Sequence, residues 1–424
     1  MSSLNRRSFL AASAAFAAAS SMPNLSRAQG ASLKLSAAKR TLDINGKAAS
    51  VYGLVNGAGG SGLILDPGQR FAADLTNALD VDPIIHWHGQ IPPNAQDEVP
   101  NMPAAPLKPG ETRSYDFAAK AGTHWMHSHI PLQEMALLAA PLIVRSADDV
   151  AADRQEVVML LNDFSFRSPE AVPAQITGGG TGDMAGMDMG TTGKMDTSAG
   201  GMKGMAEKKG MSGMSGMAMD LNDYNFDAYL TNDRTLSDPD VIAVEANGRV
   251  RLRVINGSAA TVYWIDTGRL DARLVAVDGH PIQPVLGRRF GLAIGQRLDI
   301  DVNVARVGAF PILALREGAR EQTGLILAAA GAQVARVPEM ADAASSAFDP
   351  DLAQETALRA AVPLQARAAS RTEMLMLEGS MQPYVWTING HSWADHVPVL
   401  AKSGLCCTNR LKAGVPLFPD RLIP

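Results

Sequence analysis

The chain has 424 residues, of which 46% are hydrophobic and 19% charged, a composition that supports two or three packed domains and argues against general disorder. Its formal net charge of −5 argues against a nucleic-acid-binding protein, which normally presents a basic face. The only cysteines, Cys406 and Cys407, are adjacent, so they offer neither a disulfide framework nor a C-x-x-C metal motif.

The N-terminus has the pattern of an export signal. The twin arginine Arg6–Arg7 precedes an alanine-rich stretch, and a small-x-small sequence ends at Ala28. The pattern predicts a twin-arginine signal peptide over residues 1–28, and with it recognition by the twin-arginine export machinery and a periplasmic location. The alternative is a membrane anchor, but an apolar run of about a dozen residues is too short to span a bilayer, so no membrane span is expected.

Beyond the signal, short alternating or β-branched runs are separated by turn residues. The clearest runs cover residues 113–119, 140–146, 249–257 and 295–304. Asn-Gly pairs, which favour tight hairpin turns, begin at residues 45, 56, 247, 256 and 389. Long apolar patterns with a 3.6-residue period are scarce, and only 338–371 could hold a helix or a linker. These features predict an all-β chain built of sandwiches.

The first β unit, expected over residues 33–147, contains two His-x-His pairs. One is His86 and His88, and the other is His127 and His129. A strand points residues i and i+2 to the same face, so each pair presents two imidazoles side by side. Imidazole suits zinc, copper, iron and nickel, so the pairs indicate a metal site without choosing the metal.

The second β unit, expected over residues 155–330, is interrupted by a low-complexity insert at about 177–220. Ten of the twenty methionines of the chain lie in this insert, on a background of glycine and polar residues. They show no strand or helix period, so the insert is either a flexible linker or, as we expect, a loop that collects copper, because thioether sulfur selects Cu(I). The ten are Met184, Met187, Met189, Met195, Met202, Met205, Met211, Met214, Met217 and Met219.

A linker is expected over residues 331–371. A third β unit is expected to begin at 372 and to stay incomplete over 372–424, because roughly 50 residues are half of what a sandwich of this kind needs.

The sequences HWHG at 86–89 and GTHWMHSH at 122–129, with LQEMALLAAPLIV behind the second, resemble those of the multicopper oxidases, the laccase-like and copper-efflux or copper-resistance oxidases of bacteria. RVRLRVINGS and VDGHPI resemble the second domain of that family, and MQPYVWTING resembles the start of its third. The likeness covers nearly the whole mature chain up to about Gly404. It implies tandem cupredoxin-like Greek-key β-sandwiches, two complete and a third incomplete.

The resemblance also implies roles for four histidines. His86 would be a ligand of the type 2 copper, and His88, His127 and His129 would be ligands of the type 3 copper pair. The implied reaction is oxidation of Cu(I) or a phenol at a type 1 copper, coupled to reduction of O2 at the trinuclear cluster, with no catalytic residue beyond the metal ligands. His124 lies outside the matching pattern and is expected to be a strand-surface side chain.

Two further motifs of the family have no counterpart in this sequence. These are a His-x-x-His-x-His string and a His-Cys-His string, which supply the type 1 site and half of the histidines of the trinuclear cluster. His280, His391 and His396 match neither, and no histidine follows Gly404. We therefore expect an interrupted or frameshifted C-terminal region near Gly404 and an oxidase that is inactive or impaired.

Three alternatives remain open at this stage. The chain could be a non-enzymatic periplasmic copper-binding protein that confers copper tolerance, a metal-free sandwich used as a scaffold, or a zinc hydrolase. The hydrolase would need alternating strands and helices, which the pattern does not show.

Overall fold

The computed structural model describes residues 32–97, 104–130, 132–177, 224–304, 307–348, 351–365, 374–381 and 384–392. The predicted signal peptide, the ten methionines of the insert and the residues around Gly404 all lie outside these ranges.

The first sandwich consists of two four-stranded sheets. One has the order β2 (Lys47–Asn56), β1 (Leu33–Ile44), β4 (Arg70–Asn77) and β6 (Thr112–Ala118). The other has the order β3 (Leu63–Leu65), β8 (Ala139–Val144), β7 (Gly122–Ser128) and β5 (Ile85–His88). The pairs β1–β4 and β3–β8 are parallel, and the other pairs are antiparallel.

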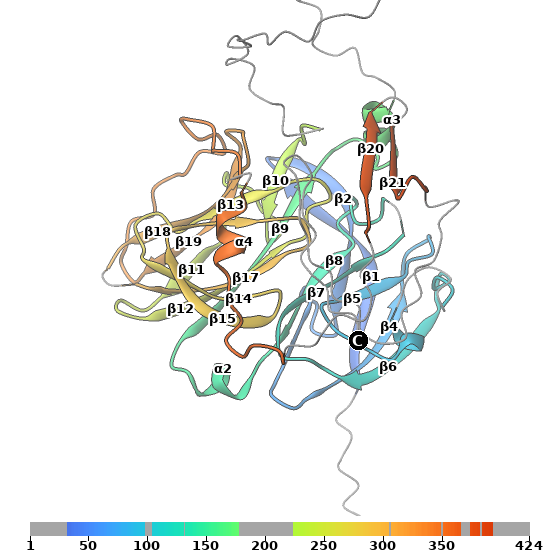
Figure 1. Ribbon diagram of the computed structural model, residues 1–424, viewed down its shortest axis with the longest axis horizontal. Coiled ribbons are helices and arrows are strands. Elements are labelled where there is room, and N and C mark those ends of the chain that lie inside the picture. Colours follow the sequence, from blue (N-terminus) through green and yellow to red (C-terminus); the bar gives the residue numbers. More distant parts are fainter. Residues whose placement is uncertain are drawn as a thin grey trace, which may run out of the picture.

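The second sandwich lies beside the first (Figure 1) and pairs a six-stranded sheet with a five-stranded one. The larger sheet has the order β10 (Ala228–Thr231), β9 (Gln155–Phe164), β12 (Arg249–Asn256), β17 (Arg297–Asn303), β14 (Ala272–Val277) and β15 (His280–Gly287). The smaller has the order β11 (Val241–Val244), β19 (Gln322–Ala329), β18 (Ala309–Arg316), β13 (Tyr263–Asp266) and β16 (Arg289–Leu292).

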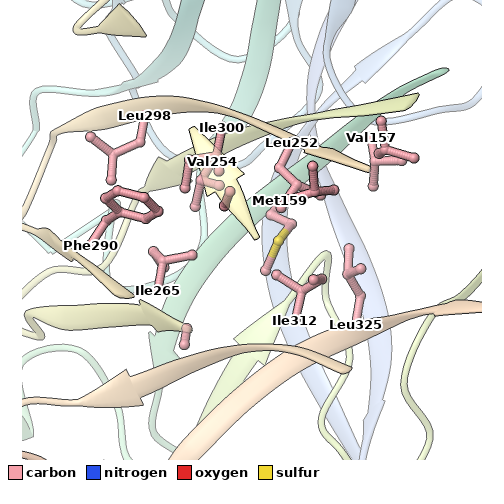
Figure 2. Close-up of a cluster of buried hydrophobic side chains, with 14 of the residues drawn as sticks. Val157, Met159, Leu252, Val254, Ile265, Phe290, Leu298, Ile300, Ile312 and Leu325 are labelled. Atoms are coloured by element: carbon pink, nitrogen blue, oxygen red, sulfur yellow. The ribbon is translucent and has the colours of Figure 1, made fainter. Parts of the chain in front are cut away.

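Each sandwich is held by apolar side chains that alternate along its strands. In β18, for example, every second residue is buried, as expected for a strand with one face on a core. Figure 2 shows the core of the second sandwich, where Leu252 and Ile300 from the six-stranded sheet face Ile312 from the five-stranded sheet. The core of the first sandwich contains Trp87 and Met126, which come from the two histidine-bearing strands.

The four runs read from the sequence are confirmed as strands β6, β8, β12 and β17. The Asn-Gly pairs behave less uniformly. Both residues take positive φ at Asn45–Gly46, which joins β1 to β2, and at Asn389–Gly390. Asn56 and Asn256 instead end strands, because their side chains bond to the backbone of the loops that follow.

Helices in the described residues are short. They are the 3₁₀ turn η1 (Asn94–Gln96) and the α-helices α2 (Ala147–Ala151), α3 (Ala171–Thr177) and α4 (Ala353–Ala357). Only α4 falls in the stretch 338–371 that could have been a longer helix. None of the helices in this described part is long and apolar enough to cross a membrane. In these ranges most strands are followed directly by another strand. The regular alternation of strands with helices that a zinc-hydrolase barrel requires is missing there, so that alternative is wrong.

A separate hairpin follows the second sandwich. It pairs β20 (Leu377–Met381) with β21 (Tyr384–Ile388). Leu377 and Ile388 lie opposite one another, and both are about half exposed. A two-stranded hairpin is marginally stable without a covering layer, and these apolar side chains are the ones that such a layer would cover.

Candidate metal centre

The two His-x-His pairs lie on neighbouring antiparallel strands. In the β5–β7 ladder, His86 is directly opposite His127, and His88 is opposite Trp125. Residues that are opposite one another in a ladder share a face. Trp87, between the two histidines of β5, points the other way and packs on Phe71 in the core, with ring centroids 4.7 Å apart. Strand alternation therefore turns the imidazoles away from the core of the first sandwich.

The four predicted histidines come together in space. The His86 and His129 rings are stacked with centroids 4.4 Å apart, and those of His127 and His129 are 5.0 Å apart. The His88 ring lies 5.5 Å from His86 and 5.3 Å from His127. His86 and His127 are buried, and His88 and His129 are half-buried.

One pair of ring nitrogens has a separation suited to a shared ion. Nδ1 of His88 lies 3.1 Å from Nε2 of His127. Nitrogen ligands bind transition metals at about 2.0–2.1 Å, so two of them on one ion at an ordinary angle are about 3 Å apart. The donor set of these two residues therefore fits a single metal ion between them.

Two carboxylates approach the outer nitrogens of the cluster. Asp97 Oδ1 lies 2.9 Å from Nδ1 of His86. Glu134 Oε2 lies 3.6 Å from Nδ1 of His127, beyond hydrogen-bond reach, and that buried nitrogen has no hydrogen-bond partner among the described residues. A carboxylate on the non-ligating nitrogen fixes the tautomer and orientation of a metal-binding imidazole. Sequence reasoning missed both residues, because no spacing rule ties such a partner to its histidine.

The arrangement is not a closed site. Over the described ranges, no three His, Cys, Asp or Glu side chains surround a common point in the geometry of one metal ion. The structure brings the four predicted histidines together as a cluster, without placing three of them around one ion.

His124 is not the strand-surface side chain that the sequence suggested. It is completely buried, and within the part of the chain that the structure describes neither ring nitrogen has a hydrogen-bond partner. It shares a face of β7 with Met126, which belongs to the core of the first sandwich. Burial, and next the charge of Arg297, lower the pKa of His124 to about 3, so the ring is neutral at physiological pH.

The remaining described histidines lie apart from the cluster. His280 begins β15 after a turn, and its Nε2 is 2.9 Å from Lys120 Nζ. Burial, and next the charge of Lys120, lower the pKa of His280. His391 lies in the turn after β21, and His396 is outside the described residues.

Comparison with known proteins gives a consistent result. Family models described as multicopper oxidase match residues 36–149 and 197–332. Copper resistance protein A of Escherichia coli is 29% identical over 291 residues, which are 66% of this chain and 47% of that protein. Multicopper oxidase MmcO of Mycobacterium tuberculosis is 26% identical over 436 residues, which are 94% of this chain and 81% of that protein.

Solved structures agree on the fold. The laccase from Botrytis aclada has a TM-score of 0.61 at 19% identity, covering 84% of this chain and 63% of that one. Fet3p, a multicopper oxidase that functions in iron import, has a TM-score of 0.60 at 13% identity, with the same two coverages. These similarities confirm the expected cupredoxin-like sandwiches.

The chain spans about half the length of the copper resistance proteins that it matches. The two family models, by contrast, together match well over half of the chain itself. They fall on both sandwiches and include both His-x-His pairs. The chain therefore belongs to the multicopper oxidase family.

Proposed function

We propose that His86, His88, His127 and His129 bind copper, as half of the ligand set of a copper-dependent oxidase. The observation that carries the proposal is the 3.1 Å separation between Nδ1 of His88 and Nε2 of His127 within a four-histidine cluster. His86 would hold the type 2 ion and the other three histidines the type 3 pair. The proton on the outer nitrogen of His86 would be held by Asp97, and that of His127 would point at Glu134.

Bound copper would supply one-electron redox chemistry that couples oxidation of Cu(I) or a phenol to reduction of O2. The protein contributes the positions of the rings. Pairing of β5 with β7 sets which histidines lie opposite one another, and Asp97 would fix the tautomer of His86 that presents its other ring nitrogen to the metal.

We further propose that residues 1–424 by themselves bind copper but turn over O2 poorly. The sequence supplies four of the expected eight histidines at matching positions, and it contains neither a His-Cys-His string nor another type 1 ligand set in register. The sharpest expected sign is the lack of the intense blue colour that a thiolate-bound type 1 copper gives.

A second candidate is a copper-binding protein of the periplasm that works without catalysis. The ten methionines of the insert favour it, because thioethers retain Cu(I). The matched relatives called copper resistance proteins point to the same biological setting. The twin-arginine pattern at residues 1–28 supports export to the periplasm.

The domain limits also belong to this proposal. We place cupredoxin-like domains at 33–147 and 155–330, a linker at 331–371 and the start of a third domain at 372. The sheets of the two sandwiches support the first two ranges, and the β20–β21 hairpin supports the last.

The experiment is metal analysis of the purified chain combined with O2 consumption. Copper should bind, His88→Ala and His127→Ala should lower its occupancy, and His280→Ala, a histidine outside the cluster, should not. Copper uptake with no O2 consumed on Cu(I) or phenol supports the copper-binding candidate. Blue colour with sustained turnover would overturn the proposed impairment. Zinc in place of copper, or a copper occupancy that is unchanged in His88→Ala and His127→Ala, would overturn the proposed site itself.

A further inference from the structure

We propose that a turn of the second sandwich positions the histidine cluster of the first. The turn comprises residues 293–296, between β16 and β17, and it acts through Gly295 and through Arg297, the first residue of β17. The inference rests on the proposed copper-binding role of the cluster. It adds that the geometry of the cluster is set by residues that lie more than 160 positions away in the chain.

The turn is held rigidly by its own hydrogen bonds. Gln296 N donates to Ala293 O at 3.1 Å, and the Gln296 side chain accepts from Ala293 N at 3.0 Å. Gly295 N donates to Asn256 O at 2.9 Å, while Gln296 O accepts from Asn256 N at 3.0 Å. A turn tied on both sides to a buried strand residue can act as a fixed surface.

Gly295 brings this surface against the metal-binding face. Its φ is +73°, and a Cβ built there would lie 3.4 Å from Cε1 of His88 and 4.0 Å from Cζ2 of Trp125. A single methyl group would therefore just touch the two rings, and a longer side chain that continued in the same direction would press on them. Trp125 stacks on His127 with centroids 3.9 Å apart and an interplanar angle of 9°. Pressure at Gly295 would therefore reach both His88 and His127.

Arg297 holds the strand that carries His127. Its side chain is 4% exposed. Nε donates to the backbone oxygen of Thr123 at 3.3 Å, and Nη1 donates to Gly295 O at 3.0 Å and pairs with Asp278 at 2.9 Å. One guanidinium therefore links the turn to β7, and its planar fork of donors suits such a bridge better than a lysine would.

The side chain of Thr123 also bonds to the second sandwich. Its hydroxyl donates to Asp299 and accepts from Arg253 Nη1 at 3.1 Å, and both partners belong to the second sandwich. Thr123, Trp125 and His127 lie at every second position of β7, so they share one face. That face is the one on which Trp125 packs against the second sandwich.

These contacts make the second sandwich a template for the cluster. Strand pairing alone sets which residues are opposite, but rings can still rotate about χ1 and χ2. The Gly295 backbone lies about one methyl group away from the His88 ring and limits how far it can turn that way, and the stack on Trp125 limits the His127 ring. The 3.1 Å nitrogen separation is thus a property of both sandwiches together.

The first test replaces Gly295 with asparagine, one of the residue types other than glycine that best tolerate positive φ. Gly268→Asn is the matched control, because Gly268 has φ +60° in the same sandwich and, among the described residues, its Cβ would meet only a backbone oxygen of Pro311. Imidazole nitrogen signals are measured by long-range ¹H–¹⁵N NMR in the metal-free full chain. Gly295→Asn should shift the His88 and His127 signals, and Gly268→Asn should leave them in place.

The second test replaces Arg297 with lysine, which keeps the charge but loses the fork. Arg316→Lys is the control, since Arg316 is also buried in the second sandwich and bonds there to Tyr224 and Asn225. Copper affinity is measured by competition with a coloured chelator. Arg297→Lys should weaken binding severalfold, less than the tenfold or more that loss of a direct outer partner of a metal ligand costs, because Arg297 reaches the cluster only through the turn and Thr123. Arg316→Lys should not change it.

The two possible failures are distinguishable. If wild-type protein binds no copper, the proposed function fails, while the NMR signals of the metal-free chain still decide the role of the turn. If Gly295→Asn leaves the His88 and His127 signals at their wild-type positions, or Arg297→Lys binds copper as wild type does, the positioning role is overturned.

Discussion

The buried, neutral ring of His124 should make the free energy of unfolding fall in mild acid. The ring is completely buried, and burial together with the charge of Arg297 lowers its pKa from 6.5 to about 3. Between these two values the unfolded chain binds a proton that the folded chain does not. Stability must therefore fall as the pH is lowered through 6.5 and continue to fall towards 3.

The magnitude follows from the shift. One pKa unit corresponds to about 1.4 kcal/mol, so the full shift is worth about 5 kcal/mol, reached only below pH 3. Between pH 7 and pH 5, the folded ring stays neutral while the unfolded ring becomes charged, and this costs about 2 kcal/mol. His124→Leu removes the titrating group and leaves no polar atom in its place, so its free energy of unfolding should lack this part of the pH dependence.

Urea titrations at pH 7, 6 and 5, with a chelator present to remove metal, would measure both proteins. The backbones of Gly89 and Gly279 lie against the His124 ring, so His124→Leu will also change the packing there. This changes the free energy of unfolding by the same amount at each pH and cancels when the pH-dependent losses of the two proteins are compared. Wild type should lose about 2 kcal/mol more than His124→Leu over this range. Equal losses would show that the ring is protonated inside the folded protein, and the account of its burial would be refuted.

Three other substitutions test the junction, the core and the site. Thr123→Val deprives the buried Asp299 carboxylate of a donor and should lower the free energy of unfolding in urea by about 2 kcal/mol. An unchanged unfolding midpoint would contradict the proposal that Thr123 holds β7 to the second sandwich. Ile300→Ala empties a fully buried position in the second core and should cost about 3 kcal/mol in the same assay, whereas a loss below about 1 kcal/mol would mean that the core closes over the cavity. Asp97→Asn removes the charged acceptor at His86 Nδ1 and should weaken copper binding about tenfold with little change in unfolding; unaltered affinity would exclude an orienting role.

The all-β class and the histidine faces could be predicted because both follow from a local period. A strand alternates its side chains whatever it packs against, so HWHG was enough to place His86 and His88 on one face and Trp87 on the other. The same alternation, applied to β7, would have put His124 with Met126 on the inner face. The expectation of a surface position went wrong because it considered a family pattern and not this neighbour.

The residues that complete the site could not be predicted, since their contacts depend on packing between distant segments. Asp97 reaches His86 from a loop, and nothing in its spacing distinguishes it from other aspartates. In the sequence, Gly295 has the pattern of an ordinary turn residue and Arg297 that of the first residue of a strand. Only the docking of the second sandwich on β7 gives them a role.

The amino-acid sequence by itself determined the strands, the sides on which their imidazoles point and the family to which they belong, because these depend on neighbours a few positions apart. Tertiary structure alone decided that the four rings meet, that His124 is shut away from water and that one sandwich sets the ring positions of the other. Those outcomes depend on strand register and on the docking of surfaces, which are settled by side chains far apart in the chain.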